Sequence, residues 1–295
     1  MLVHLSRYRE ALAVAEEALA NFDTYYRGQR NSLGYIAKQF ALEFLGEWGR
    51  ALQWSEELAA LMNKTGYPAR AASFMMSRAR ICIHADDWAS AQSFLESVLP
   101  LCVESKLVPL IRSCQAWIAL TRARLGNVGP AMDLLLMLEE DLSRLPLPAD
   151  ITFRPALEWA FVETFMAAGD MTKADLHHQR WVTAAERVGE VTLQGLAWEA
   201  GARIALAKKD AIEAKRCLSS AFSSIEGYEA PVAAWKIHAS AAEAEGLLGN
   251  DAVAENHRRV SAAIVLELTR SLPETDPTRN ALLSSPRAKR VLLPR

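Results

Sequence analysis

The sequence lacks the motifs that mark most nucleotide-binding and hydrolytic enzymes. It contains no GxxxxGK[ST] phosphate loop, no GxGxxG turn and no GxSxG nucleophile elbow. No stretch approaches the roughly 18 consecutive apolar residues that a membrane-spanning helix needs. The formal net charge is only −2, so the chain as a whole is not attracted to nucleic acid. We therefore expect no enzymatic activity, no catalytic residue and no membrane partner, and nucleic acid is not favoured as a partner.

Cysteine and histidine are also scarce. Four cysteines and six histidines are spread over 295 residues, with no CxxC pair and no zinc-ligand spacing. We interpret the cysteines as buried thiols of a reducing compartment, and we expect neither a metal site nor a cofactor. Residues 1–12 lack the charged start and unbroken apolar core of a signal peptide, so the expected location is the cytoplasm.

What the sequence does contain is an alanine that recurs about every forty residues. The intervals between successive copies are 40, 40, 40, 43, 40 and 40 residues. The alanines are Ala11, Ala51, Ala91, Ala131, Ala174, Ala214 and Ala254. Five residues before each alanine stand Ser6, Gly46, Asp86, Gly126, Gly169, Lys209 and Gly249. A repeat of this length indicates stacked supersecondary units.

Each copy has the pattern of a helical hairpin. An apolar helix runs up to the turn residue, which is often a glycine that can adopt the left-handed conformation ending a helix. A second helix follows, and its early alanine lets the two helix axes approach closely. The single interval of 43 residues contains the proline-rich segment 145–155, where three extra residues cost little.

The turn glycine, the aromatic residue two positions later (Trp48) and the alanine five positions later resemble the tetratricopeptide repeat. The resemblance covers residues 1–269, although its copies are longer than the usual ~34 residues. Forty-residue copies are similar to the repeat regions of large bacterial regulators of the maltose-activator type and of adenylate cyclases linked to an ATPase core. The resemblance implies an all-α, right-handed superhelix (an α-solenoid) of about seven hairpins.

The two ends differ from the other copies. Residues 6–22 form a second helix whose partner would precede Met1, which predicts an uncovered apolar face. We expect either that the natural polypeptide begins further upstream, or that a cap or a second copy of the chain covers residues 6–22. Residues 270–295 are predicted to hold two short capping helices, because Asp276-Pro277 and Ser285-Pro286 each have the pattern of an N-cap followed by proline. This segment has a basic excess, which we interpret as a solvated tail rather than a nucleic-acid patch.

Histidines and groove positions are the candidates for a site. His178 occupies a position that leucine holds in other copies, so we interpret His177-His178 as packed residues rather than metal ligands. First helices line the concave groove in tetratricopeptide proteins, and equivalent positions there give groove candidates for partner binding. These candidates are Phe40, Arg80, Glu163, Arg203 and Glu243. Mutual neutralisation between neighbouring repeats is the preferred interpretation of the charges, and a polar site for a peptide or small effector is the alternative.

The resulting functional prediction is a non-enzymatic protein-interaction and scaffolding module that binds a protein or peptide segment in its groove. The resemblance implies the C-terminal regulatory region of a multidomain bacterial signalling or transcriptional regulator. The alternative is a freestanding adaptor that assembles partner proteins. A receptor for a small effector is a third hypothesis.

Overall fold

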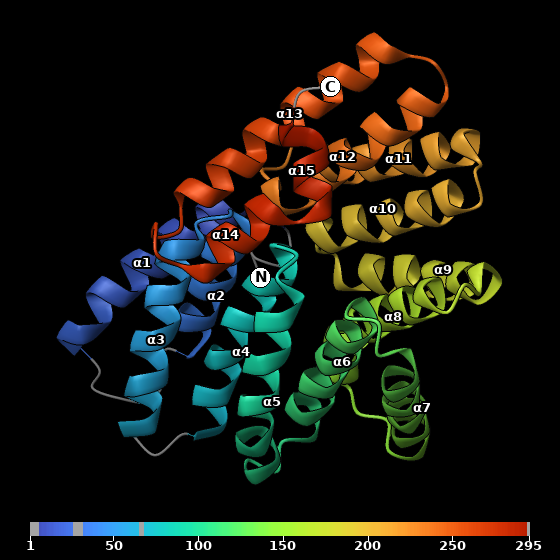
Figure 1. The fold of residues 1–295 in the computed structure, drawn as a ribbon. Helices are drawn as coiled ribbons and strands as arrows, with labels where there is room; N and C mark the ends of the chain where they lie inside the picture. The colour runs from blue at the N-terminus through green and yellow to red at the C-terminus, as the bar shows by residue number, and fades with distance from the viewer. Residues whose placement is uncertain (1–5, 26–31, 65–67, 294–295) are drawn as a thin grey trace.

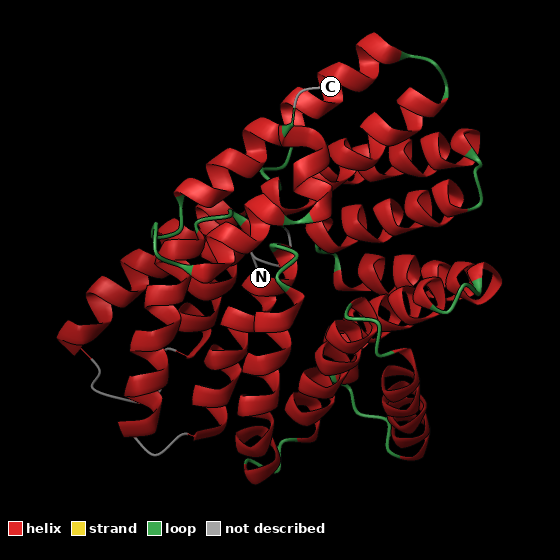
Figure 2. Cartoon of the chain, viewed as in Figure 1, coloured by secondary structure: helices red, strands yellow, loops and turns green. Residues whose placement is uncertain are grey.

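The computed structural model describes residues 6–25, 32–64 and 68–293. These ranges contain fifteen helices and no strand (Figures 1 and 2). In chain order the helices are α1 (Tyr8–Tyr25), α2 (Ser32–Phe44), α3 (Trp48–Lys64), α4 (Pro68–His84), α5 (Trp88–Glu104), α6 (Val108–Arg124), α7 (Val128–Arg144), α8 (Asp150–Ala167), α9 (Met171–Val188), α10 (Val191–Ala207), α11 (Ala211–Ile225), α12 (Pro231–Leu247), α13 (Asp251–Arg270), α14 (Pro277–Ser284) and α15 (Pro286–Leu292). None of the helices in these ranges is long and apolar enough to cross a membrane.

The predicted turns are confirmed at every copy. All seven turn residues have a positive φ, which is the left-handed conformation that ends a helix and starts a new one. The values are 54° for Ser6, 74° for Gly46, 57° for Asp86, 85° for Gly126, 77° for Gly169, 61° for Lys209 and 76° for Gly249. The recurring alanines are 0 to 3% exposed. The hairpins α2–α3, α4–α5, α6–α7, α8–α9, α10–α11 and α12–α13 stack into the predicted all-α superhelix, with α1 as an additional second helix.

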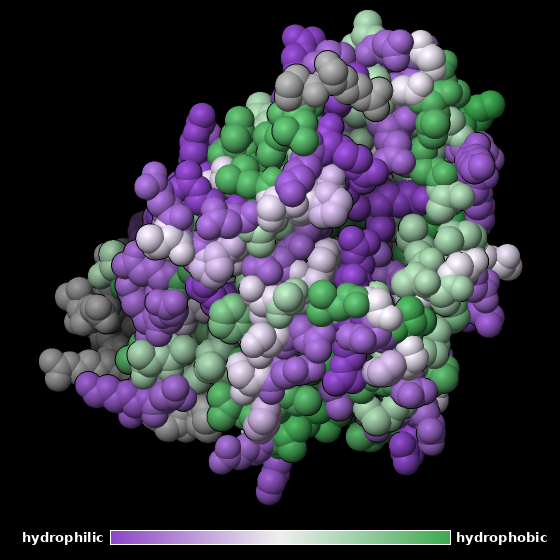
Figure 3. All heavy atoms as spheres, in the orientation of Figure 1, coloured by the Kyte–Doolittle hydropathy of each residue, from purple (hydrophilic) through white to green (hydrophobic). Residues whose placement is uncertain are grey.

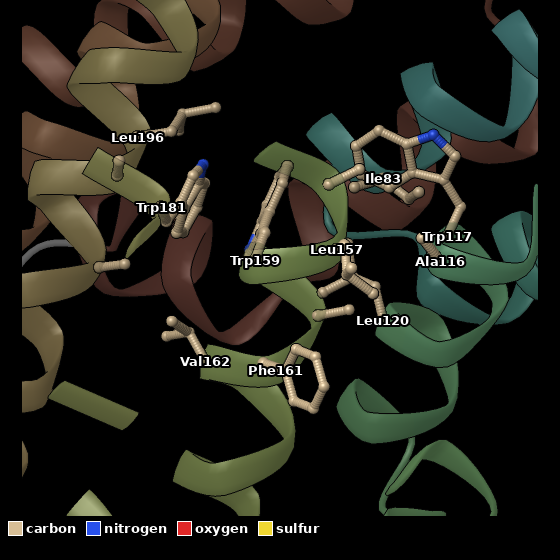
Figure 4. Packing of buried hydrophobic residues seen from close by; sticks show 14 of the residues in the cluster. Ile83, Ala116, Trp117, Leu120, Leu157, Trp159, Phe161, Val162, Trp181 and Leu196 are labelled. Carbon is tan, nitrogen blue, oxygen red and sulfur yellow. The ribbon is translucent and has the colours of Figure 1, made fainter. Parts of the chain in front are cut away.

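The core follows the stack from one hairpin to the next. Its centre contains three tryptophans from α6, α8 and α9. The ring of Trp159 stacks on Trp181 at a centroid distance of 5.1 Å and meets the edge of Trp117 at 5.7 Å (Figure 4). These large rings fill the space between α6, α8 and α9, while the small alanines allow the two helices of one hairpin to pack closely.

The two ends of the superhelix meet. Tyr8 and Trp48, from α1 and α3, share one buried cluster with Trp235 and Leu268 from α12 and α13 (Figure 1). The backbone N–H of Trp48 donates to the hydroxyl of Ser271 at 3.1 Å. A Cβ atom on Gly49 would lie 2.0 Å from the carbonyl oxygen of Ser271, so only glycine allows this approach. The stack therefore closes on itself across more than 220 residues of sequence.

This closure covers the face that we expected to be uncovered at residues 6–22. The backbone N–H of Val191 donates to Ser6 Oγ at 2.9 Å, and the hydroxyl of Tyr8 donates to Glu190. Tyr8, Ala11, Leu12 and Ala15 are at most 6% exposed, whereas Val14 is 55% exposed. The sequence could not show these contacts, because Glu190 and Val191 lie more than 180 residues away from Ser6 and Tyr8. A homo-oligomer formed through this segment stays a prediction.

The two predicted C-terminal helices are present, and both N-caps are confirmed. Asp276 accepts a hydrogen bond from the N–H of Thr278 at 2.9 Å, and Ser285 accepts one from Ala288 at 3.2 Å. These helices do more than cover the last hairpin. Asp276 of α14 forms an ion pair with Arg78 of α4 at 3.2 Å, while α15 packs on α12 and α13. The segment is therefore a packed bridge between the α4–α5 and α12–α13 hairpins, not the solvated tail that we expected.

A pH dependence follows from the closure. Burial raises the pKa of Glu190 to about 7, although the N–H groups of Thr192 and Leu193 act in the opposite direction. The folded state then holds a proton that the unfolded state releases between about pH 4.5 and 7, so this group's stabilisation falls as the pH rises through that window. We expect Glu190→Gln to gain up to ~3 kcal/mol relative to wild type between pH 5 and 8.

The measurement is the difference between the urea unfolding free energies of wild type and Glu190→Gln at each pH. The difference is needed because burial lowers the pKa of His84 to about 3 and that of His178 to about 4, and these groups change total stability in the opposite direction. A difference that stays constant from pH 5 to 8 would show that Glu190 is ionised throughout.

Candidate functional site

Seven charged side chains converge in the interior of the superhelix. They come from the α4–α5 turn and from α6, α8, α10, α12 and α15, and we call them the central charge network. Its members are Asp86, Arg124, Glu163, Glu199, Arg203, Lys236 and Arg287. The first helices of successive hairpins face inward, so charges that are about forty residues apart in sequence become neighbours.

Glu163 is the centre of one half of the network. It is 4% exposed and accepts hydrogen bonds from Arg124 at 3.0 Å, from Arg203 and from the indole N–H of Trp159 at 3.1 Å. Burial disfavours its ionisation, but Arg203 and Arg124 outweigh burial and hold its pKa below the usual range. Glu163 is therefore a fixed negative charge between two cations rather than a proton-transferring group.

Lys236 and Asp86 form the other half. Their charged atoms lie 2.9 Å apart, and both side chains are almost completely buried. Glu199 connects the two halves, because it contacts Arg203 at 3.2 Å and Arg287 at 3.4 Å and accepts a hydrogen bond from Ser240 at 2.6 Å. The space left among these side chains is only about 10 Å³. The centre is thus filled by the protein's own charges.

The structure divides the five groove candidates into separate places. Glu163 and Arg203 belong to the central charge network, and Glu243 pairs with Arg290 of α15 at 3.1 Å. Arg80 lies elsewhere, 5.0 Å above the ring of Phe40. Arg80 is also paired with Glu43 of α2 at 2.8 Å. Glu163 and Arg203 thus pair across neighbouring repeats, whereas the partner of Glu243 lies on α15, outside the repeat.

Sequence reasoning did not single out Glu199, Lys236 or Arg287 as site residues. The sequence gives one indication that Lys236 is buried. This lysine lies inside the apolar run PVAAWKIHASAA of α12. A charge in such a run is rarely buried unless it has a partner. Its partner Asp86 occupies the turn position of the repeat, and that position alone accounts for Asp86 in the sequence.

A cavity of about 420 Å³ opens beside the network, between α10, α12, α13 and α15. We call it the arginine pocket, because four arginines line it. These are Arg203, Arg258, Arg287 and Arg290. Among the described residues, Glu243 is the one carboxylate of the lining, and Leu247 and Val291 are among its apolar members. Hydrophilic side chains gather beside α15 on the side facing α10 (Figure 3).

A larger hollow of about 770 Å³, which we call the α7–α9 groove, lies where the 43-residue interval inserts three residues. Leu147, Ile151 and Leu176 are among its apolar lining residues. Arg154, Arg180 and Arg187 form its rim, where Arg180 also pairs with Glu139 at 3.7 Å. Of the lining carboxylates, Asp150 is held by Arg112, and Glu158 is held by Arg154 and His177. Ile151 is 48% exposed and Leu176 is 51% exposed.

Arg112 holds together the α7–α8 junction, which forms part of this groove. Its guanidinium is 1% exposed and donates to the carboxylates of Asp141 and Asp150 and to the carbonyl oxygens of Asp141 and Leu145, at 2.8 to 3.1 Å. Asp150 in turn accepts the N–H of Leu147 at 2.7 Å. One arginine thus fixes the end of α7, the inserted loop and the start of α8.

The adjacent histidines are packed, as their repeat positions predicted. Nδ1 of His177 lies 2.8 Å from Glu158, and the ring stacks on Phe161. His178 packs edge-on against Trp198, 5.7 Å between ring centroids, and its Nε2 has no hydrogen-bond partner. Across the described part of the chain, no three His, Cys, Asp or Glu side chains are arranged to hold a metal ion.

His178→Leu is expected to leave the free energy of unfolding at pH 7 unchanged or to raise it by about 1 kcal/mol. Leucine fills the equivalent position in other copies, and the substitution removes a buried polar atom that lacks a partner. The measurement is urea unfolding followed by circular dichroism. Gly201→Ala is the contrasting variant, because its Cβ would lie 2.5 Å from the His178 ring and should destabilise the protein. A loss of more than about 2 kcal/mol in His178→Leu would mean that the imidazole makes a required interaction.

Comparison with known proteins identifies the fold. No family model matches the sequence, and no curated protein matches it. Among solved structures, the chain is similar to RapI in its apo form, with a TM-score of 0.58 and 12% identity over 90% of this chain and 92% of that one. It also matches BtubC (BKLC) from P. vanneervenii, with a TM-score of 0.49 and 13% identity over 79% of this chain and 94% of that one. The likeness to RapI supports the helical superhelix and, at this identity, extends to the fold alone.

Proposed function

We propose that this chain is a non-enzymatic protein-interaction scaffold whose α7–α9 groove holds an acidic, amphipathic segment of a partner protein. The observation that carries the proposal is the groove itself. It combines half-exposed apolar side chains with a rim of three arginines in a hollow of about 770 Å³. Apolar residues in a concave site surrounded by arginine are typical of interfaces.

The filled interior favours this groove over the concave centre. The central charge network leaves about 10 Å³ between its side chains, and α14 and α15 connect the α4–α5 hairpin with the α12–α13 hairpin. A peptide in the centre would have to displace paired, buried charges, which costs several kcal/mol. The α7–α9 groove needs no such rearrangement, because its apolar residues are already in contact with solvent.

Site-specific photo-crosslinking in the cells that make the protein tests this proposal. We expect a covalent adduct with a defined partner from a photoreactive residue at Ile151 or Leu176. Ile212 is the control position, because it is also an exposed apolar residue, at 77%, but lies on α11 outside the groove. A second variant, Arg187→Glu with the probe at Leu176, should abolish the adduct if the partner segment is acidic. Equal adducts from Ile212, or none from the groove positions, would contradict the proposal.

We further propose that the scaffold is the C-terminal regulatory region of a multidomain bacterial signalling or transcriptional regulator. The support is the forty-residue period, which resembles the repeat regions of such proteins. An immunoblot of the source cells with an antibody to residues 271–295 tests the context. A band several times larger than 32.6 kDa would support the regulator. A band at 32.6 kDa would instead support the freestanding adaptor.

A further inference from the structure

We propose that the arginine pocket is a binding site for a small molecule that carries a compact dianionic group, either a phosphate or a pair of carboxylates. This site is separate from the α7–α9 groove, so it does not depend on the protein-interaction proposal. Its volume of about 420 Å³ lies within the range of small-molecule sites. The lining combines four guanidinium groups with alanine, leucine and valine side chains, which suits an organic anion better than a bare ion.

The strongest argument is a buried arginine with unused donors. Arg258 is 9% exposed, and its Nε donates to Glu255 at 2.8 Å. Arg258 lines the pocket, and its two terminal nitrogens have no acceptor among the described residues. These N–H groups are free to donate two parallel hydrogen bonds to an anion in the pocket.

Arg287 and Arg290 add charge from α15. Arg287 is 11% exposed at its side chain, and its one ion-pair partner among the described residues is Glu199, at 3.4 Å. Glu199 is shared with Arg203, so one carboxylate serves two arginines. Arg290 stands at the mouth, where it is 63% exposed and pairs with Glu243 at 3.1 Å. The described lining of the pocket therefore presents four guanidinium groups and one carboxylate, although Glu163, Glu199 and Glu255 contact these arginines from outside the lining.

The carboxylate of Glu243 repels an anion in the pocket, and this repulsion gives a second test of the site. Its carboxylate lines the pocket and is 44% exposed, so it would lie beside the bound anion. Removing its charge should strengthen anion binding, while removing Arg290 should weaken it. These two variants change opposite members of one ion pair, so a general loss of structure cannot produce both results.

A bound dianion would also fasten α15. The pocket is formed by α15 on one side and by α10, α12 and α13 on the other, so a ligand in contact with both sides holds the C-terminal helix in place. Ligands that bind only the folded arrangement stabilise it. We expect slower amide hydrogen exchange over residues 286–292 when the pocket is occupied.

Isothermal titration calorimetry with inorganic phosphate, phenyl phosphate and succinate, at ionic strength matched with sodium chloride, tests the site. We expect one saturable site in the wild type. Affinity should fall about tenfold in Arg258→Gln and in Arg290→Gln and should rise severalfold in Glu243→Gln. Arg270→Gln is the matched control, because Arg270 lies on the same helix as Arg258 and pairs with a glutamate three residues before it, but is 70% exposed. Its affinity should equal that of the wild type.

The ligands distinguish the source of the dianion. Binding of the two phosphates without succinate assigns a phosphoryl ligand, and binding of succinate alone assigns a dicarboxylate. The proposal is overturned if no ligand binds saturably up to about 10 mM, or if Arg290→Gln and Glu243→Gln bind as the wild type does. Arg290 and Glu243 are both well exposed, so these variants decide the question even if Arg258→Gln fails to fold.

Discussion

Lys236→Ala is expected to lower the free energy of unfolding by about 3 to 5 kcal/mol. The substitution removes the ammonium that lies 2.9 Å from Asp86 and leaves a buried carboxylate without its main partner. Burial disfavours the charge on Asp86, but Lys236 and then Arg287 outweigh it and keep the pKa of Asp86 below its usual value. Without Lys236, Asp86 must either remain as an uncompensated buried charge or take up a proton. Both alternatives destabilise the folded state.

Urea unfolding of three variants measures this effect. Lys215→Ala is the matched control, since Lys215 also pairs with a carboxylate at 2.8 Å but is 58% exposed, and the expected loss is below about 1 kcal/mol. The double variant Lys236→Met with Asp86→Asn should recover part of the loss, because no unpaired charge is left buried and asparagine tolerates the positive φ at this turn. If Lys236→Ala unfolds within 1 kcal/mol of the wild type, water must reach Asp86 and the centre is not sealed.

The repeated part of the fold was predictable because its causes are local. A residue with positive φ, an early alanine and a helix N-cap each act within a few residues, so Gly126, Ala131 and Asp276 could be assigned from the sequence. The same reasoning succeeded for His178, since a leucine at the equivalent position of other copies identifies a packed slot.

The contact between the two ends of the superhelix and the central charge network depend on the geometry of the whole stack, which no local sequence pattern contains. Small rotations between successive hairpins add up over six repeats, and only their sum decides whether Trp48 reaches Ser271 or whether Lys236 reaches Asp86, 150 residues away. Glu163 and Arg203 were found because they occupy equivalent positions one repeat apart. Arg287 was not, because it lies outside the repeat.

Arg112→Ala is expected to cost about 3 to 5 kcal/mol of unfolding free energy and to loosen the inserted loop. The guanidinium is 1% exposed, and its five hydrogen bonds satisfy two carboxylates and two carbonyl oxygens at the α7–α8 junction. Truncation leaves Asp150 and the end of α7 without their donors. Arg112→Lys should recover only part of the loss, because an ammonium has three donors at one point and cannot span acceptors on both sides.

Urea unfolding gives the global effect, and limited proteolysis across residues 145–150 gives the local one. Arg144→Ala is the control, because Arg144 is 70% exposed and its pair with Glu140 is 3.9 Å long, so the expected change is within about 0.5 kcal/mol. A fully stable Arg112→Ala variant with an uncleaved loop would show that the junction is held by packing alone. Because Asp150 and Ile151 line the α7–α9 groove, Arg112→Lys should also reduce the crosslinked adduct at Ile151. That loss would connect the one irregular interval of the repeat to the groove that we propose as the partner site.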